Sequence, residues 1–369
     1  MSQRALRVGI IGADTKASWA KASHIPAITG LAALKLAAVA TRSEQSAREA
    51  AEAFGAERWF SDPLAMIRDD LIDIVTLAVK VPAHRALVLA ALAAGKAVYC
   101  EAPLGRNTTE AEEMARAARS RHTASGLQGR LNPSLRRARE LISSGKIGRP
   151  LSAKVVSRTM GFGPEMASRI DLLNKASSGA NMLTITAGHT LDAVEALLGP
   201  IVNVDARAEI LWPTVILTDT SERSARETPD HAGILGKTQS GAVFTAEIAG
   251  VVAPTDIGFS FEVSGSEGWL GLSSHHPYGF QAGDLKLASN VAFDKPEEAV
   301  VGGGMMGAAI NVGEVYAHLA RDLMEGSYTT PGFDPRPSQC PSHRGCGARR
   351  RSGHAPETGL GPVLINRSR

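Results

Sequence analysis

A histidine and an aspartate lie three residues apart in a stretch of helical pattern near the middle of the chain. These are His189 and Asp192, within residues 180–199, and their spacing places both on one face of a helix. Imidazole has an ordinary pKa of about 6.5, so His189 is suited to accept or donate a proton at neutral pH. A hydrogen-bonded core histidine on an apolar helix is the competing explanation.

Glycines near the N-terminus are of the type that binds a dinucleotide. The strand-like run of residues 7–12 contains Gly9 and Gly12 and continues through Ala13 into a helical stretch. The backbone amides of such a turn cradle a pyrophosphate at a helix N-terminus. The full G-x-G-x-x-G pattern is absent, because Asp14 occupies the next glycine position. An ordinary strand–helix turn therefore explains this signal equally well.

The end of the second predicted strand indicates which dinucleotide binds. An acid there accepts a hydrogen bond from the ribose of NAD, whereas an arginine accommodates the 2′-phosphate of NADP. Arg42 and Ser43 follow residues 34–40, and the first acid is Glu44. This pattern favours NADP, with NAD possible. A solvated loop arginine is the alternative explanation.

These residues are positioned by a predicted doubly wound α/β domain. Apolar strands alternate with helical stretches through residues 5–126, which indicates a parallel sheet covered on both faces. After Pro133 the strands follow one another, which indicates an antiparallel sheet. The strands predicted in this second part are residues 151–160, 202–210, 242–251 and 258–272.

Composition and charge exclude several classes of protein. Of 369 residues, 44% are hydrophobic and 21% charged, which is typical of globular chains. No uncharged run reaches the roughly 18–20 residues of a membrane span. The N-terminus has no signal-peptide pattern, and three cysteines favour a reducing compartment, so we expect a cytoplasmic protein without a membrane partner.

The net charge of +3 originates in the last 38 residues. Residues 332–369 carry seven Arg and two acids, a net charge of +5, which leaves −2 for residues 1–331. The body of the protein is therefore not basic, so its charge gives no support to a nucleic-acid partner. Residues 332–369 are predicted to be an irregular basic tail, disordered or produced by a frameshift. We predict no metal site, because Cys340, His343, Cys346 and His354 fit no standard zinc finger.

Three tracts resemble the glucose–fructose oxidoreductase / inositol dehydrogenase / rhizopine-catabolism (Gfo/Idh/MocA) family. They are VKVPAHRALVLAALAAGKAVYCEAPLG (79–105), QGRLNPSLRRARELISSGKIGRPL (128–151) and AGHTLDAVEALLG (187–199), which has the family's H-x-x-D pattern. With the N-terminal strand they cover residues 5–330 in the family's order. SWAKASHIPAI and GANMLTI resemble the branch of the fungal galactose-regulon inhibitor, which binds a dinucleotide and acts on a transcription activator.

The resemblance implies two domains and a cofactor site. We predict a Rossmann dinucleotide-binding domain in residues 1–126. An α+β substrate and oligomerisation domain with an open antiparallel sheet follows in residues 127–331. The chain is expected to form a homo-oligomer, a dimer or tetramer, and to bind a nicotinamide cofactor and a sugar or polyol. The cofactor-lining residues implied after the third and fourth strands are Val79, Lys80, Pro82, Glu101 and Pro103, with Ala102–Pro103 as a cis peptide bond.

Two departures from the family pattern concern catalysis. Ala102 stands where the family's Glu-Lys-Pro motif has the lysine that assists proton transfer, and Ile185 stands where the family has an aspartate. A positioned general base contributes about 10²–10⁴-fold, so its loss lowers activity without forbidding it. His189 is then the proposed acid/base, positioned or supported by Asp192.

Three functions remain open from the sequence. The favoured one is an NADP-preferring oxidoreductase acting on a sugar or polyol hydroxyl. The alternative is a catalytically silent, dinucleotide-binding regulator that acts through a protein partner. The third is an oligomer whose sheet face has only a structural role.

Overall fold

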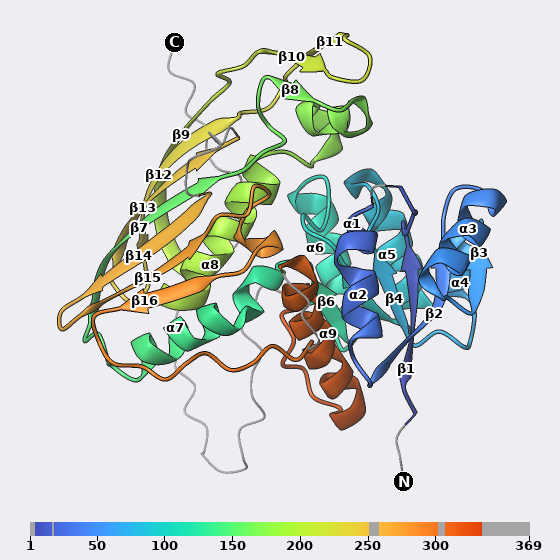
Figure 1. Cartoon of the computed structure of the whole chain (residues 1–369), viewed down its shortest axis with the longest axis horizontal. Coiled ribbons are helices and arrows are strands. Elements are labelled where there is room, and N and C mark those ends of the chain that lie inside the picture. The colour runs from blue at the N-terminus through green and yellow to red at the C-terminus, as the bar shows by residue number, and fades with distance from the viewer. Residues whose placement is uncertain (1–3, 17, 251–257, 302–306, 334–369) are drawn as a thin grey trace, which may run out of the picture.

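The computed structural model describes residues 4–16, 18–250, 258–301 and 307–333. Two sheets lie side by side, with helices between and around them (Figure 1). The predicted tail and its cysteine–histidine set lie outside the described residues, except for Gly332 and Phe333. Phe333 is buried against the first sheet, and its backbone N–H donates to Oγ1 of Thr123 at 3.3 Å.

The first sheet is parallel throughout and confirms the doubly wound prediction. Its strand order is β3-β2-β1-β4-β5-β6, so the order reverses between β1 and β4. The central strands β1, β2, β4 and β5 are almost wholly buried and mostly apolar because both faces of the sheet are covered. The strands are β1 (Leu6–Ile11), β2 (Leu34–Ala40), β3 (Arg58–Phe60), β4 (Ile74–Leu77), β5 (Ala97–Cys100) and β6 (Thr123–Ser125).

Helices from both ends of the described chain cover this sheet. One face packs against α2, α3 and α9, and the other against α4, α5 and α6. α9 follows the second domain in sequence, yet its apolar side joins the core of the first sheet (Figure 1). These helices, with the short α1, are α1 (Trp19–Ala22), α2 (His24–Thr29), α3 (Glu44–Phe54), α4 (Pro63–Ile67), α5 (His84–Ala93), α6 (Thr108–Ala117) and α9 (Ala308–Glu325).

The second sheet has the order β16-β15-β14-β7-β13-β12-β9. Its pairings are antiparallel, as predicted, except that β7 and β13 run parallel. The apolar sides of α7 (Pro133–Ser143) and α8 (Gly188–Leu198) cover one face. The strands are β7 (Pro150–Arg158), β9 (Ile201–Glu209), β12 (His231–Thr238), β13 (Val243–Ala249), β14 (Phe259–Gly265), β15 (Trp269–Ser274) and β16 (Lys286–Ser289).

The prediction of a single strand over residues 258–272 was wrong. β14 and β15 form an antiparallel hairpin, and the backbone N–H of Gly265 donates to the carbonyl of Gly268 at 2.7 Å. A Cβ on Gly265 would collide with the backbone of Ile147, so the close approach requires glycine. The alternating pattern continues on both sides of the turn, so the sequence alone did not reveal the turn.

The remaining elements connect the two sheets and form a small third sheet. Its strands are β8 (Glu165–Met166), β10 (Thr214–Leu217) and β11 (Arg223–Ala225). The short helices are η1 (Val81–Ala83), η2 (Gln128–Leu131), η3 (Ser168–Asn174), η4 (Ala176–Ser178), the π-helical η5 (Leu183–Ala187) and η6 (Phe280–Ala282).

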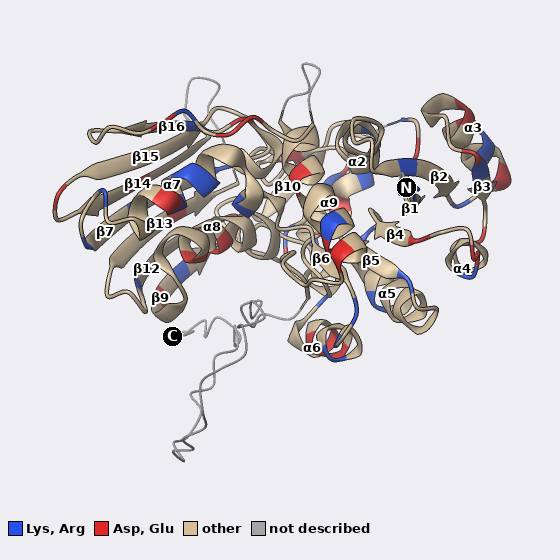
Figure 2. Cartoon of the chain, turned by 90° about the horizontal axis from the view of Figure 1, so that it is seen from below, with Lys and Arg blue, Asp and Glu red and all other residues tan. Residues whose placement is uncertain are grey.

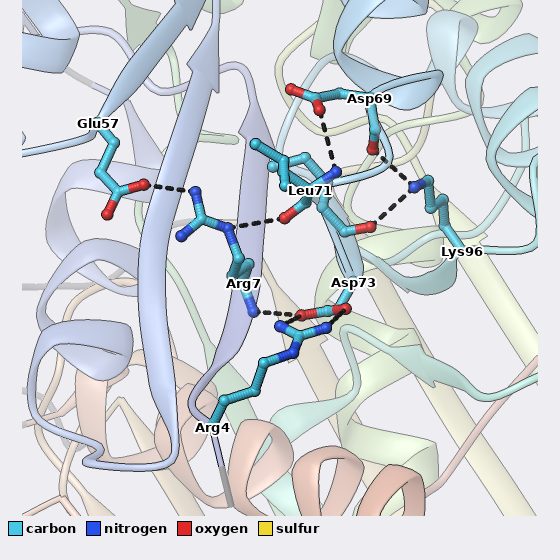
Figure 3. A network of polar contacts seen from close by, with 8 residues as sticks. Arg4, Arg7, Glu57, Asp69, Leu71, Asp73 and Lys96 are labelled. Atoms are coloured by element: carbon cyan, nitrogen blue, oxygen red, sulfur yellow. Dashed lines mark hydrogen bonds and ion pairs between the residues drawn. The ribbon is translucent and has the colours of Figure 1, made fainter.

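Charged groups pin the amino-terminal edge of the parallel sheet (Figure 3). Both Nη atoms of Arg4 donate to the Asp73 carboxylate at 2.8 Å, and the backbone N–H of Arg7 donates to the same group. Burial alone would raise the pKa of Asp73, but these hydrogen bonds outweigh it and lower the pKa. The network lies at the edge opposite to strand ends that bind ligands, so we assign it to stability.

The described surface carries charges of both signs. Figure 2 shows acidic and basic residues mixed over both sheets, with both signs on α3 and on α7. In the part of the chain that the structure describes, no helix is long and apolar enough to span a bilayer.

Candidate functional site

The carboxyl ends of four parallel strands bring most of the predicted cofactor residues to one edge of the first sheet. Residues 12–13 follow β1, residues 41–43 follow β2, residues 79–82 follow β4 and residues 101–103 follow β5. The strand order reverses beside β1, and ligands of doubly wound sheets bind at such a switch point.

The turn after β1 requires glycine at position 12. Gly12 has φ +100°, and a Cβ there would lie 2.5 Å from the carbonyl oxygen of Ala78. Its N–H donates to the carbonyl of Ala40 at 2.9 Å, which holds the turn between β2 and β4. Gly9, in contrast, lies inside β1, where a Cβ would be 3.0 Å from Met66. Packing under α4 is therefore a second explanation for Gly9, and its place in the cofactor cradle stays a prediction.

The carboxylate of Asp14 has a hydrogen-bond partner within its own loop. Its Oδ1 accepts a hydrogen bond from the backbone N–H of Lys16 at 2.9 Å. Its carbonyl accepts from Oγ of Ser18, which in turn caps α1 by accepting from the N–H of Lys21. Asp14 thus forms hydrogen bonds within its own loop, as the aspartate of an Asx turn does.

Arg42 and Ser43 follow the end of β2, and their side chains differ in their contacts. Oγ of Ser43 caps α3 by accepting from the backbone N–H of Ser46 at 3.2 Å. Arg42 is exposed, and its guanidinium has no ion pair with any described residue. A 2′-phosphate beside β2 would therefore meet an available guanidinium and a hydroxyl held by a helix start.

His84 joins the loop after β4 to the loop after β5. Its Nε2 lies 3.0 Å from the carbonyl oxygen of Val79, and its Nδ1 lies 3.2 Å from the carbonyl oxygens of Pro103 and Leu104. The side chain is buried, and burial lowers its pKa. His84 thus fixes the backbone on either side of the predicted nicotinamide position. Lys80, in the first of these loops, is exposed.

Glu101 extends from the end of β5 toward a buried histidine. Its Oε1 lies 2.9 Å from Nε2 of His24, and Nδ1 of His24 lies 3.0 Å from the hydroxyl of Tyr316. That hydroxyl is 2.7 Å from Oγ1 of Thr76. Four elements, α2, β4, β5 and α9, therefore converge on one chain of polar groups.

His189 lies on α8 and is buried beside Phe280, whose ring centroid is 6.5 Å away in an edge-on arrangement. Burial lowers its pKa to about 4, and the negative charge of Glu101 opposes this shift. No described residue hydrogen bonds to its ring. His189 is therefore a neutral imidazole at physiological pH, and the charge of Glu101 acts on it.

Asp192 is paired with Arg130 instead of His189. Nε and Nη2 of Arg130 contact its two carboxylate oxygens at 3.0 and 2.7 Å. Burial raises the pKa of Asp192 to about 6, with Arg130 opposing. The structure thus does not make Asp192 a hydrogen-bond partner of His189, because its carboxylate turns to η2.

Sequence reasoning missed three residues of this arrangement: His24, Tyr316 and Arg130. His24 and Arg130 lie in tracts that carried the family resemblance, and Tyr316 lies in an amphipathic stretch near the end of the described chain. A polar aromatic residue within an apolar helical face was the available signal for Tyr316. Its partner His24 is 292 residues away in sequence, and no local pattern connects them.

Comparison with known proteins agrees with this geometry. Residues 6–127 match the model of an oxidoreductase family with an NAD-binding Rossmann fold, and residues 133–274 match the Gal80p C-terminal domain. The chain is 30% identical over 283 residues to inositol 2-dehydrogenase 2 of Saccharopolyspora erythraea, covering 74% of each protein. It belongs to the Gfo/Idh/MocA oxidoreductase family.

Two further similar proteins extend the comparison. Dehydrogenase aclE of Aspergillus oryzae is 36% identical over 228 residues, which cover 60% of this chain and 62% of that protein. The chain therefore spans less than two thirds of this relative. An NAD-binding oxidoreductase from Klebsiella pneumoniae superposes with a TM-score of 0.73 at 26% identity, covering 89% of this chain and 93% of that one.

The Gfo/Idh/MocA motif after β5 is altered at one position. Ala102–Pro103 is a cis peptide, as the family resemblance implied. The residue before the proline is alanine where the family pattern has lysine, so no ammonium group extends from this turn. Nor does Ile185, in η5, supply the second acid of the family helix. Of the predicted site residues, His189 and Glu101 remain as two titratable groups whose charges interact.

Proposed function

We propose that this protein is an NADP-preferring oxidoreductase that transfers hydride between the dinucleotide and a hydroxyl of a sugar or polyol. The observation that supports the proposal is the buried His189 on α8, whose ring has no hydrogen-bond partner among the described residues and whose pKa the negative charge of Glu101 raises against the effect of burial. Curated dehydrogenases among the relatives support the reaction class. We further propose a cytoplasmic protein.

The chain's own residues would perform the proton part of this reaction. When bound, the nicotinamide supplies the hydride chemistry. Gly12 and Ala13 would hold the pyrophosphate through backbone amides, and Val79–Pro82 with Pro103 would flank the ring. A ring nitrogen of His189 would take the hydroxyl proton during alcohol oxidation and return it during reduction. Its location in an apolar site keeps it neutral and therefore able to accept a proton.

A retention and turnover experiment tests the proposal. The purified protein is incubated with NADP and NAD, the retained dinucleotide is identified, and that complex is screened against sugars and polyols. Retention of NADP with absorbance change at one or more substrates is the expected result. No turnover over the panel, with no effect of His189→Ala on any other property, would overturn the enzyme proposal.

The pH profile of alcohol oxidation is expected to reflect the low pKa of His189. kcat/KM should be level through neutral pH and fall only as pH decreases toward about 4, because the imidazole must be neutral to accept a proton. The measurement is kcat/KM over a pH series from acidic to mildly alkaline, in buffers of constant ionic strength. A midpoint at about 6 would instead assign the titration to Asp192.

Arg42→Ala is expected to weaken NADPH binding by about 10–100-fold and to leave NADH binding unchanged. The guanidinium would lose a charge-assisted contact with the 2′-phosphate, worth about 1.5–3 kcal/mol. Dissociation constants from the quenching of protein fluorescence measure the effect. Arg68→Ala, an exposed arginine at the end of α4, is the matched control. Equal losses for both dinucleotides would contradict the NADP preference.

A second candidate function is a dinucleotide-binding regulator that acts through a protein partner. Two observations favour it: Ala102 replaces the family lysine, and residues 133–274 match the Gal80p C-terminal domain. Tight NADPH retention without turnover would support the regulator. NADP reduction that collapses in His189→Ala, with cofactor affinity kept, would remove it.

We also propose that the open face of the second sheet joins copies of this chain. Leu235, Val243 and Trp269 are each more than 40% exposed on these strands, although strand patterns normally place polar residues on a solvated face. Light scattering after size exclusion tests this. A dimer or tetramer that dissociates in Leu235→Glu is expected, and a wild-type monomer would contradict it.

A further inference from the structure

The Glu101 carboxylate depends on one side chain for its orientation. Within the part of the chain that the structure describes, Nε2 of His24 is the hydrogen-bond partner of that carboxylate, at 2.9 Å. The Glu101 side chain is 15% exposed, so little water is available to replace this contact. A mostly buried carboxylate needs a hydrogen-bond donor to hold it in place.

The His24 ring is itself immobilised. It is fully buried, and the rings of Tyr99 and Tyr316 meet it edge-on at centroid distances of 5.0 and 5.6 Å. Nδ1 faces the hydroxyl of Tyr316, so the ring cannot turn without losing both hydrogen bonds. The histidine is therefore held before any ligand arrives.

The direction of the hydrogen bonds follows from the acceptor at the end of the chain. An ionised carboxylate only accepts, so Nε2 of His24 carries a proton and donates to Glu101. With a neutral ring, Nδ1 accepts from the Tyr316 hydroxyl, and the Tyr316 oxygen accepts from Thr76. Every donor in this arrangement points toward Glu101, so the series of hydrogen bonds fixes the direction in which its carboxylate is held.

We propose that His24 is a positioning residue: it fixes the ionised Glu101 carboxylate at the site, and this carboxylate stabilises the protonated form of His189 during alcohol oxidation. The inference rests on the proposed function, because it assumes that His189 receives the substrate proton. It also explains how α9, from the end of the described chain, takes part in the site. His24 on α2 contacts Glu101 directly, and the charge of Glu101 also acts on His84 on α5, Tyr99 and Cys100 on β5, His189 on α8 and Tyr316 on α9.

A pair of substitutions at position 24 tests this directly. His24→Leu removes the donor, whereas His24→Gln keeps an N–H near the position of Nε2. We expect kcat to fall by about 10–100-fold in His24→Leu, as when a catalytic group loses its support, with NADPH affinity unchanged. His24→Gln should recover most of that loss. Thermal melting of both variants verifies that the fold is kept.

A spectroscopic readout is independent of turnover. The ring resonances of His189, assigned by comparison with His189→Gln, are titrated by NMR in the dinucleotide-free protein. His24→Leu and Glu101→Gln should both move the His189 titration to lower pH by about half a unit or more, because an opposing charge is misplaced or removed. In His24→Gln, the ring of His189 should titrate at the same pH as in the wild type.

The outcomes separate the two proposals. If the wild type turns over no substrate but His24→Leu shifts the His189 titration, the proposed function fails and the positioning role stands. If His24→Leu and His24→Gln lose activity equally and neither shifts the titration, the positioning role is overturned. The positioning role also fails if the double variant His24→Leu/Glu101→Gln loses the product of the two single effects, since residues acting through one contact are not additive.

Discussion

Replacing His189 by alanine is expected to lower kcat/KM for alcohol oxidation by about 10²–10⁴-fold, the usual contribution of a positioned general base. The side chain is buried on α8, its pKa is lowered to about 4, and no described residue hydrogen bonds to its ring. A neutral ring without an internal partner is available for a substrate hydroxyl. Dinucleotide affinity should be unchanged, because the cofactor residues lie on the loops of the first sheet.

A second histidine of the same domain provides the matched control. His231, on β12, is partly exposed on the second sheet and lies 3.9 Å from Glu247. His231→Ala should keep kcat/KM within about twofold, since exposed substitutions away from a site have small effects. Steady-state kinetics and NADPH binding are measured for both variants. Similar activity in His189→Ala and His231→Ala would exclude the proposed base and leave the regulator as the better explanation.

Asp230→Ala is expected to lower the free energy of unfolding of the second domain by about 3–5 kcal/mol. Asp230 and Arg226 have side chains that are each 1% exposed, and Nη1 of Arg226 contacts Oδ2 of Asp230 at 2.6 Å. Asp230 also accepts from the backbone N–H groups of Leu211 and Trp212 at 2.8 and 2.9 Å. Its removal leaves a buried guanidinium without a counter-charge and two amides without acceptors.

The loss should be concentrated around the small third sheet. Arg226 also donates to the carbonyls of Phe162 and Gly163, so the pair joins the segment before β8 to the segment after β11. Urea unfolding followed by tryptophan fluorescence reports the change, since Trp212 is an immediate neighbour. Arg207→Ala, which removes the exposed pair with Glu209, should cost less than about 1 kcal/mol. Equal midpoints for the two variants would contradict a structural role for the buried pair.

Periodicity was sufficient to predict the fold class. The apolar strands of residues 5–126 and the alternating strands beyond Pro133 require one covered sheet and one half-covered sheet, and both are present. Local pattern does not report which strands pair. The parallel contact of β7 with β13, the hairpin within residues 258–272 and the position of α9 against the first sheet therefore appeared only in the structure.

Some features of the candidate site could likewise be predicted from the sequence, whereas others appeared only in the structure. Residues at the ends of parallel strands, such as Gly12, Arg42 and Glu101, could be grouped in advance, because those ends must share one edge of the sheet. Gly9 stays a prediction, and in the structure it lies inside β1, where a Cβ would be 3.0 Å from the end of the Met66 side chain.

The sequence by itself determined the two sheets and the sheet edge where the cofactor is predicted to bind, because these depend on hydrophobic period and on strand direction, and its motifs indicated the family by resemblance. Only the tertiary structure decided the partners: Glu101 with His24, 77 residues apart, and Asp192 with Arg130, 62 apart. Such pairs are selected by burial, since a charge removed from water must find a donor or counter-charge wherever the packed chain supplies one.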